Sequence, residues 1–408
     1  MKKIFKKLLA ILTLFGPGLF LIGYNIGTGS ITTMSKTGAD HGMGLFWILV
    51  LAAVFTYVMM VAYGKTTLVT GHTALYNIKV GFKQGWILAL YIMVALIAGE
   101  LLAVMGLMGI TADLLQEGLR ITLGVTIAPV WIILMIVIGL YALLWYGHYR
   151  TFEKVLFGFV ILLGLTFILV FILVKPDPVA ILKGLIPSIP THNLGLIAAI
   201  AGTTCSAAVF IIRSTVVAEK GWTINDLKTE KKDSFVSATT MLILSAVIMA
   251  VSAGTLHVMG LTLDQTTDMI YLFEPLGGKA ASLILIFGVS GAAISTVFPI
   301  ALIAPWLIAD YTGKPRNTQS MQSRIMMLIA LLFGFASVIM EQRPPALMIF
   351  SQAFQACILP AVAIPIIILL NRKNLMGEHC ASMKENIGLA AVIVFSLFTT
   401  YYAIVELF

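Results

Sequence analysis

Long apolar stretches follow one another along almost the whole chain, and they limit its possible folds more than any other feature. A membrane-spanning helix needs about 20 mostly apolar residues, and eleven stretches of this 408-residue chain meet that need. Their approximate ranges are 9–35, 44–70, 86–112, 126–146, 152–174, 194–218, 234–257, 279–309, 323–341, 346–370 and 387–408. The connections between them are short. The sequence therefore predicts an all-α integral membrane protein with eleven transmembrane helices in a single domain, residues 1–408.

The composition excludes several classes of protein. Hydrophobic residues make up 60% of the chain and charged residues 11%, against roughly 25% charged residues in soluble domains. This excludes a water-soluble globular enzyme, a disordered chain and a nucleic-acid-binding domain. The three cysteines are far apart and form no CxxC pair, so we expect no zinc site, no disulfide framework and no cofactor. The expected partners are the lipid bilayer and a small inorganic ion, with no nucleic acid.

Basic residues are divided unevenly between alternate loops. Of the 26 Lys and Arg residues, 18 fall on the side of the N-terminal tail, six fall on the other side, and Lys65 and Arg213 lie within predicted spans. Cytoplasmic loops carry the excess of Lys and Arg. The basic start of the chain lacks a cleavage site after a short apolar stretch, so we interpret it as a retained first span. We predict a multi-pass protein of the plasma membrane, with a cytoplasmic N terminus and an extracytoplasmic C terminus.

Two predicted spans contain runs of small and hydroxylated residues. The first span holds Gly16-Pro17-Gly18 and a run over 23–30, and the sixth holds a run over 202–206. Non-helical backbone at membrane depth is tolerated where it lines a cavity. The alternative is that these glycines only allow close helix packing. Because the two spans are five apart, they have opposite orientations, which is typical of an inverted repeat. The predicted repeats are spans 1–5 (9–175) and 6–10 (194–371), followed by an extra helix at 387–408.

Three parts of the sequence carry recognisable motifs. They run from Gly16-Pro17-Gly18 through Thr37-Gly38-Ala39 to Val69-Thr70-Gly71, from Tyr149 to Val155, and from Ser351-Gln352 through Leu359-Pro360 to Pro365. These stretches resemble the Nramp family of divalent-metal transporters. The resemblance covers spans 1–10. It implies a LeuT-like inverted repeat with broken helices in spans 1 and 6, and secondary transport by alternating access.

The functional motifs of that family are replaced in this chain. The family has Asp-Pro-Gly-Asn in the break of the first span, where this chain has Gly27-Thr28-Gly29-Ser30. The family's Met-Pro-His in the sixth span corresponds to Ser206-Ala207-Ala208, and a further family histidine aligns with Arg213. Of two acids in the third span, the first is Glu100 and the second position is Ala103. The resemblance therefore predicts no metal site built from the family's usual ligands.

The remaining groups favour a small inorganic anion such as bicarbonate. Half-helix N termini, free backbone N–H groups and hydroxyls at the breaks suit an oxyanion. Arg213 adds an intramembrane positive charge, although it could instead be an arginine that extends to the cytoplasmic surface. The alternative substrate is a divalent metal cation, Mg²⁺ or Mn²⁺, which would need a counter-charge near the breaks. The predicted substrate-binding residues are Gly27, Thr28, Gly29, Ser30, Thr203, Thr204, Ser206, Gln352 and Arg213.

Three more residues are candidates for binding a coupling ion, either H⁺ or Na⁺, in a symport mechanism. Glu100 is the candidate proton-coupling acid, and the alternative is a neutral glutamic acid bonded to a neighbouring helix. Ser295 and Thr296 would complete a sodium site, although such hydroxyls commonly bond back to their own helix. An intramembrane enzyme would need a nucleophile with a base, or a His and acid cluster, within the spans. The sequence offers neither, so we predict no enzyme. The sequence leaves the oligomeric state open, and a monomer is the simplest expectation.

Overall fold

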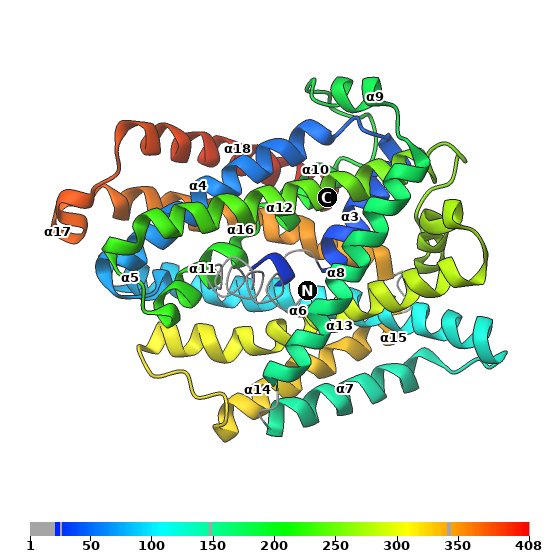
Figure 1. The fold of residues 1–408 in the computed structure, drawn as a ribbon. Coiled ribbons are helices and arrows are strands. Elements are labelled where there is room, and N and C mark those ends of the chain that lie inside the picture. Colours follow the sequence, from blue (N-terminus) through cyan, green and yellow to red (C-terminus); the bar gives the residue numbers. More distant parts are fainter. Residues whose placement is uncertain (1–20, 25–26, 147–148, 341–343, 408) are drawn as a thin grey trace, which may run out of the picture.

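The computed structural model describes residues 21–24, 27–146, 149–340 and 344–407, without the side chains of residues 28, 149–157, 159, 160 and 407. Helices make up most of this part of the chain, and the long helices pack into one body (Figure 1). The run Gly16-Pro17-Gly18, which contributed to the predicted first break, lies outside the described residues.

In this described part, nine segments are long and apolar enough to cross a membrane. They are α4 (Phe46–Thr70), α6 (Gly85–Leu123), α7 (Pro129–Tyr146), α10 with α11 (Gly195–Thr204 and Ala207–Lys220), η1 with α12 (Ile224–Asp226 and Leu227–Gly254), α13 (Gly278–Thr312), α14 with η3 and α15 (Met321–Leu332, Phe333–Phe335 and Ala336–Ile339), α16 (Pro344–Leu370) and α18 (Met383–Leu407). The two other expected spans correspond to α3 (Thr28–His41) and α8 (Tyr149–Val174), which adjoin residues outside the description. The total of eleven spans stays a prediction.

Short helices connect the long ones. They are α5 (Ala74–Gly81), α9 (Pro178–Lys183), η2 (Thr266–Leu276), α17 (Lys373–Met376) and η4 (Gly377–His379). Local sequence explains α9, because the side chain of Asp177 accepts a hydrogen bond from the Val179 backbone N–H and Pro178 occupies the first turn. A capping side chain and an early proline are both typical of helix starts. Hydropathy alone does not find such segments.

Two helices are interrupted near the centre of the molecule. Helix α10 ends at Thr204 and α11 begins at Ala207, with Cys205 and Ser206 between them. In the other repeat, residues 21–24 are helical and α3 begins at Thr28 after Gly27 in an extended conformation. Gly202 also permits close packing, because a Cβ at this position would lie 1.8 Å from the backbone oxygen of Gln352 on α16. The small residues in α10 therefore precede a helix break and also allow a close helix contact.

Burial separates the central helices from those at the periphery. The most apolar part of α10 and α11 is wholly buried, whereas only 28% of the corresponding part of α7 is buried. Large apolar side chains such as Trp131, Met135 and Ile138 are exposed on α7, as expected for a helix that faces lipid. In Figure 1, α7 runs along one edge of the bundle, while α10 and α16 lie inside it. The interrupted helices are therefore enclosed by the others.

Candidate functional site

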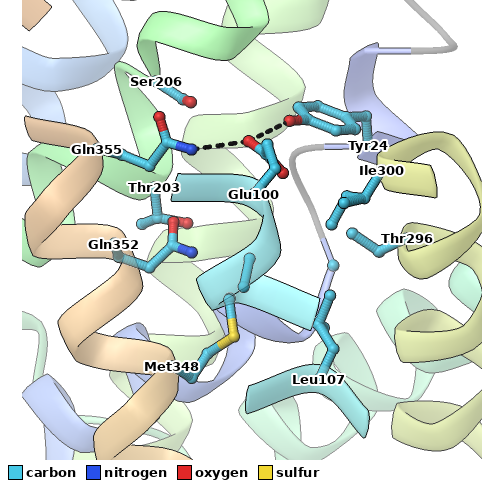
Figure 2. A pocket seen from close by; sticks show the side chains of 13 residues that line it. Tyr24, Glu100, Leu107, Thr203, Ser206, Thr296, Ile300, Met348, Gln352 and Gln355 are labelled. Atoms are coloured by element: carbon cyan, nitrogen blue, oxygen red, sulfur yellow. Dashed lines mark hydrogen bonds between the residues drawn. The ribbon is translucent and has the colours of Figure 1, made fainter. Parts of the chain in front are cut away.

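A pocket lies where the interrupted helices meet α6, α13 and α16 (Figure 2). The space open to the centre of a water-sized sphere is about 40 Å³. A cavity needs roughly 10–15 Å³ of such space to hold one water molecule, so the pocket accommodates an ion or a few waters. The lining residues are Tyr24, Gly27, Gly29, Glu100, Ala103, Leu107, Thr203, Ser206, Thr296, Ile300, Met348, Gln352 and Gln355.

Glu100 on α6 brings a carboxylate to this pocket, and its side chain is held by two neighbours. The Tyr24 hydroxyl donates a hydrogen bond to Glu100 Oε1 at 2.5 Å, and Gln355 Nε2 donates to the same oxygen at 2.7 Å. Figure 2 shows the carboxyl group between these two side chains. Both bonds end on Oε1, so neither of these two neighbours engages Oε2. The residue is only 5% exposed, so its charge acts in a poorly solvated place.

Hydroxyl groups and a glycine hold the interrupted helices close to each other and to their neighbours beside the pocket. The hydroxyls of Ser30 on α3 and Thr203 on α10 lie 2.9 Å apart in a hydrogen bond. The backbone oxygen of Thr204 accepts a hydrogen bond from Thr56 at 2.7 Å. At Gly29, a Cβ would lie 2.8 Å from Met348 Cε and 3.0 Å from Gln352 Nε2. Glycine at this position therefore allows α3 to pass close to the α16 side chains that face the pocket.

The structure brings together seven of the twelve residues that the sequence proposed for binding and coupling. These are Gly27, Gly29, Glu100, Thr203, Ser206, Thr296 and Gln352. Ser30, Thr204, Arg213 and Ser295 are not among the lining residues, and the side chain of Thr28 lies outside the description. The hydroxyls of Ser295 and Thr296 both donate to the backbone oxygen of Ala292 in their own helix, which is the alternative to a sodium site. The assignment of roles to these residues stays a prediction.

The anion hypothesis required Arg213 to direct an unpaired positive charge to the pocket, whereas its side chain is paired with carboxylates. It is fully buried on α11, and its Nη2 lies 2.9 Å from Glu230 Oε1 on α12. Its Nη1 forms a second ion pair with Asp233 of the same helix. Two carboxylates therefore compensate the guanidinium, and no unpaired positive charge is directed from it to the pocket.

Sequence reasoning assigned no role to several side chains of the lining, most clearly Gln355 and Met348. Both lie on the same face of α16 as Gln352, three residues after it and four residues before it. Residues three and four apart share a face of a helix, so the position of Gln352 would have indicated these neighbours. The spacing alone gives no reason to connect Gln355 with Glu100, which is 255 residues away in the chain.

The donors of the pocket limit its chemistry. In the described part of the chain, no group of three or more His, Cys, Asp and Glu residues is placed to hold a metal ion. The lining instead combines one carboxylate with hydroxyls, amides and the thioether of Met348. Oxygen donors suit hard divalent cations such as Mg²⁺ and Mn²⁺. A cation in this pocket would keep part of its water shell, because so few charged ligands surround it.

Comparison with known proteins decides the family. A family model described as natural resistance-associated macrophage protein-like, or Nramp, matches residues 18–406. The chain belongs to the Nramp family. It is 25% identical over 407 residues to the divalent metal cation transporter MntH of Pectobacterium carotovorum subsp. carotovorum (strain PC1), covering 95% of this chain and 93% of that one. It is 23% identical over 385 residues to the protein of the same name from Yersinia pestis (strain Pestoides F), covering 90% and 88%.

Solved structures agree on the fold. A manganese transporter of Eremococcus coleocola, solved in complex with an aromatic bis-isothiourea substituted compound, superposes with a TM-score of 0.70 at 16% identity, over 96% of this Nramp chain and 87% of the other. Mhp1, a nucleobase-cation-symport-1 family transporter, gives a TM-score of 0.63 at 15% identity, over 96% and 92%. These similarities confirm the all-α, LeuT-like inverted-repeat fold. The protein is a multi-pass membrane protein of a family that transports small ions.

The prediction of a small-anion substrate such as bicarbonate is wrong. The relatives that cover nearly the whole Nramp chain are named as transporters of divalent metal cations. The structure supplies the physical reason, since Glu100 lines the pocket and the charge of Arg213 is compensated elsewhere. The sequence does not reveal this counter-charge, because Glu100 lies in a span separate from both breaks and only the packing of α6 brings it to them.

Proposed function

We propose that this Nramp protein is a secondary transporter of divalent metal cations, Mg²⁺ or Mn²⁺, which works by alternating access around the central pocket. The observation that supports this most directly is the carboxylate of Glu100 among hydroxyl and amide groups at the helix breaks. A cation needs a counter-charge when it leaves bulk water. The names of the relatives point to the same class of substrate.

Metal uptake by proteoliposomes tests this proposal. Purified protein would be reconstituted with a metal-sensitive dye inside, and Mg²⁺ or Mn²⁺ would be added outside. We expect saturable entry through the wild type and at least an approximately tenfold lower kcat/KM for Glu100→Gln, a loss of about 1.4 kcal/mol. Glu117→Gln is the matched control, because Glu117 is on the same helix but pairs with Arg120 at its far end. Wild-type uptake by Glu100→Gln, or no metal entry through the wild type, would overturn the proposal.

We propose a proton as the coupling ion, transported in symport with the metal. The support is that Glu100 is an ionisable group in the pocket, whereas Ser295 is outside the lining and bonds to its own helix. Parallel measurement with a pH-sensitive dye tests this, since metal entry should acidify the liposome interior with or without sodium. Metal entry that requires a sodium gradient would contradict it.

We also propose a plasma-membrane location as a monomer, with the N terminus inside and the C terminus outside. The support for the orientation is the excess of Lys and Arg in alternate loops. Labelling of single cysteines introduced at the exposed residues Lys183 and Lys373 tests it, because these positions lie in loops of opposite predicted side. Labelling of both from the same side of intact cells would contradict the orientation.

A further inference from the structure

A second group of ionisable side chains lies deep in the protein, apart from the pocket. We call it the Arg213 cluster, made up of Arg213 on α11 and Glu230, Asp233 and Ser234 on α12. All four residues have a relative exposure of 0%. Arg213 contacts Glu230 through Nε and Nη2 and Asp233 through Nη1, and the Ser234 hydroxyl donates to Glu230 Oε1 at 2.8 Å. The two carboxyl groups therefore lie against one guanidinium.

The charges of this cluster do not balance. With both carboxyl groups ionised, the cluster carries two negative charges and one positive charge. Helix α12 begins at Leu227, and its N terminus contributes roughly half a positive charge. This leaves about half a negative charge in a place without access to water, where desolvation penalises every uncompensated charge.

Charged groups on the neighbouring helices are engaged elsewhere. On α4, Lys65 pairs with Glu385 at 2.9 Å, and Lys231 on the outer side of α12 also reaches Glu385. On α3, which packs against α12, Lys36 pairs with Asp40. Other ionisable groups of the packed helices are Tyr57 and Tyr63 on α4, His41 on α3, Glu219 and Lys220 on α11, Lys228 and Lys232 on α12, and Arg150, Glu153 and Lys154 on α8, where the three side chains of α8 lie outside the description.

Two carboxylate oxygens of the cluster are buried without a hydrogen-bond partner in the described part of the chain. They are Glu230 Oε2 and Asp233 Oδ1. A buried acceptor that lacks a donor is costly, and a proton on one of the two carboxyl groups would supply a donor as well as remove the excess charge. The position of Glu230 is fixed from the other side by α4, because a Cβ at Gly64 would lie 2.2 Å from Glu230 Oε1.

We propose that the Arg213 cluster is a proton-binding site in which the carboxyl groups of Glu230 and Asp233 together hold one proton. The bound proton brings the formal charge of the side chains to zero, and its release leaves one net negative formal charge that the N terminus of α12 only partly offsets. The proton belongs to the pair, since both carboxyl groups contact the same guanidinium. This assignment holds whichever ion the pocket carries, and it places a proton site outside the pocket that contains Glu100.

The cluster is connected to the pocket by a single half-helix. Arg213 follows the pocket residue Ser206 by seven residues on α11, which corresponds to about 10 Å along a helix. A divalent cation in the pocket and a proton in the cluster repel each other over this distance. By linkage, metal binding therefore favours release of the proton, and a high proton concentration weakens metal binding.

Infrared spectroscopy of the purified full-length protein tests the proton site directly. At neutral pH, the wild type should show the stretching band of a protonated carboxyl group that is absent from both Glu230→Gln and Asp233→Asn. Each substitution leaves one carboxylate paired with Arg213, so the cluster becomes neutral without a proton and the variants should stay folded. Glu378→Gln is the matched control, since Glu378 is exposed on η4, and Glu100→Gln identifies any band that comes from the pocket.

Retention of this band in either cluster variant would overturn the shared proton. Complete loss of the band in Glu100→Gln would also overturn it, because the band would then come from the pocket. A second measurement is the pH dependence of metal binding by the same proteins. Between acidic and neutral buffer, we expect metal affinity to change several-fold less in Glu230→Gln than in Glu378→Gln. An equal change would contradict the linkage between the two sites.

Discussion

Two regions of this Nramp protein contain buried carboxyl groups, and the surroundings of these groups differ. In the pocket, Glu100 faces hydroxyl and amide groups and is held by Tyr24 and Gln355, which bring no formal positive charge. In the Arg213 cluster, Glu230 and Asp233 enclose a guanidinium. The pocket therefore has a negative charge with no positive partner next to free space, whereas the carboxyl groups of the cluster are fully buried against Arg213. This comparison teaches that an intramembrane charge indicates a substrate-binding site only when it lacks an oppositely charged partner and lies next to free space.

Removal of the positive charge from the cluster should have the largest effect on stability. We expect Arg213→Gln to lower the free energy of unfolding by about 3–5 kcal/mol, because two carboxyl groups would be left buried without their partner. Thermal unfolding in detergent would measure this. Glu230→Gln, which removes the excess charge, should cost much less. Equal losses for the two variants would contradict the charge imbalance on which the comparison rests.

Two matched glycine substitutions should affect different properties. One beside the cluster should lower stability, and one at the pocket should slow transport. Gly64→Ala would force Glu230 away from its ion pair, since a Cβ there lies 2.2 Å from Oε1, and overpacking of this kind costs about 1–3 kcal/mol. Gly29→Ala would instead displace the flexible ends of Met348 and Gln352 at the pocket. We expect Gly64→Ala to lower the unfolding temperature and Gly29→Ala mainly to slow metal uptake. The reverse result would contradict the division between a structural and a substrate-binding region.

The sequence predicts the fold far better than it predicts the pocket. Apolar stretches of spanning length locate helices such as α4 and α16 within a few residues, because hydrophobicity over about 20 residues is a local property. The chemistry of the pocket depends on contacts between distant parts of the chain. Glu100 and Gln355 are 255 residues apart, and the partners of Arg213 lie on a helix that begins seven residues earlier than hydropathy predicts, at Leu227. Local sequence patterns therefore reveal neither the surroundings of Glu100 nor the pairing of Arg213.

A smaller effect is expected from one hydrogen bond at the pocket. Gln355→Leu removes the amide that donates to Glu100 Oε1 at 2.7 Å, and a hydrogen bond to a charged group contributes about 1.5–3 kcal/mol at most. We expect the KM for metal to rise roughly tenfold, with a smaller change in kcat, because the carboxylate loses its fixed orientation. Uptake assays over a range of metal concentrations would measure both constants. An unchanged KM would indicate that Tyr24 alone orients Glu100.

The smallest effect is expected at a third charge network, which is close to solvent. Arg316 pairs with Glu219 on α11 and with Asp310 on α13, each at 2.7 Å, and the Glu219 side chain is 50% exposed. Exposed ion pairs typically contribute about 0.2–1 kcal/mol and are screened by salt. Glu219→Gln should therefore lower the unfolding temperature slightly in dilute buffer, and the difference should disappear in concentrated salt. A salt-independent loss as large as that of Arg213→Gln would mean that burial does not set the strength of these networks.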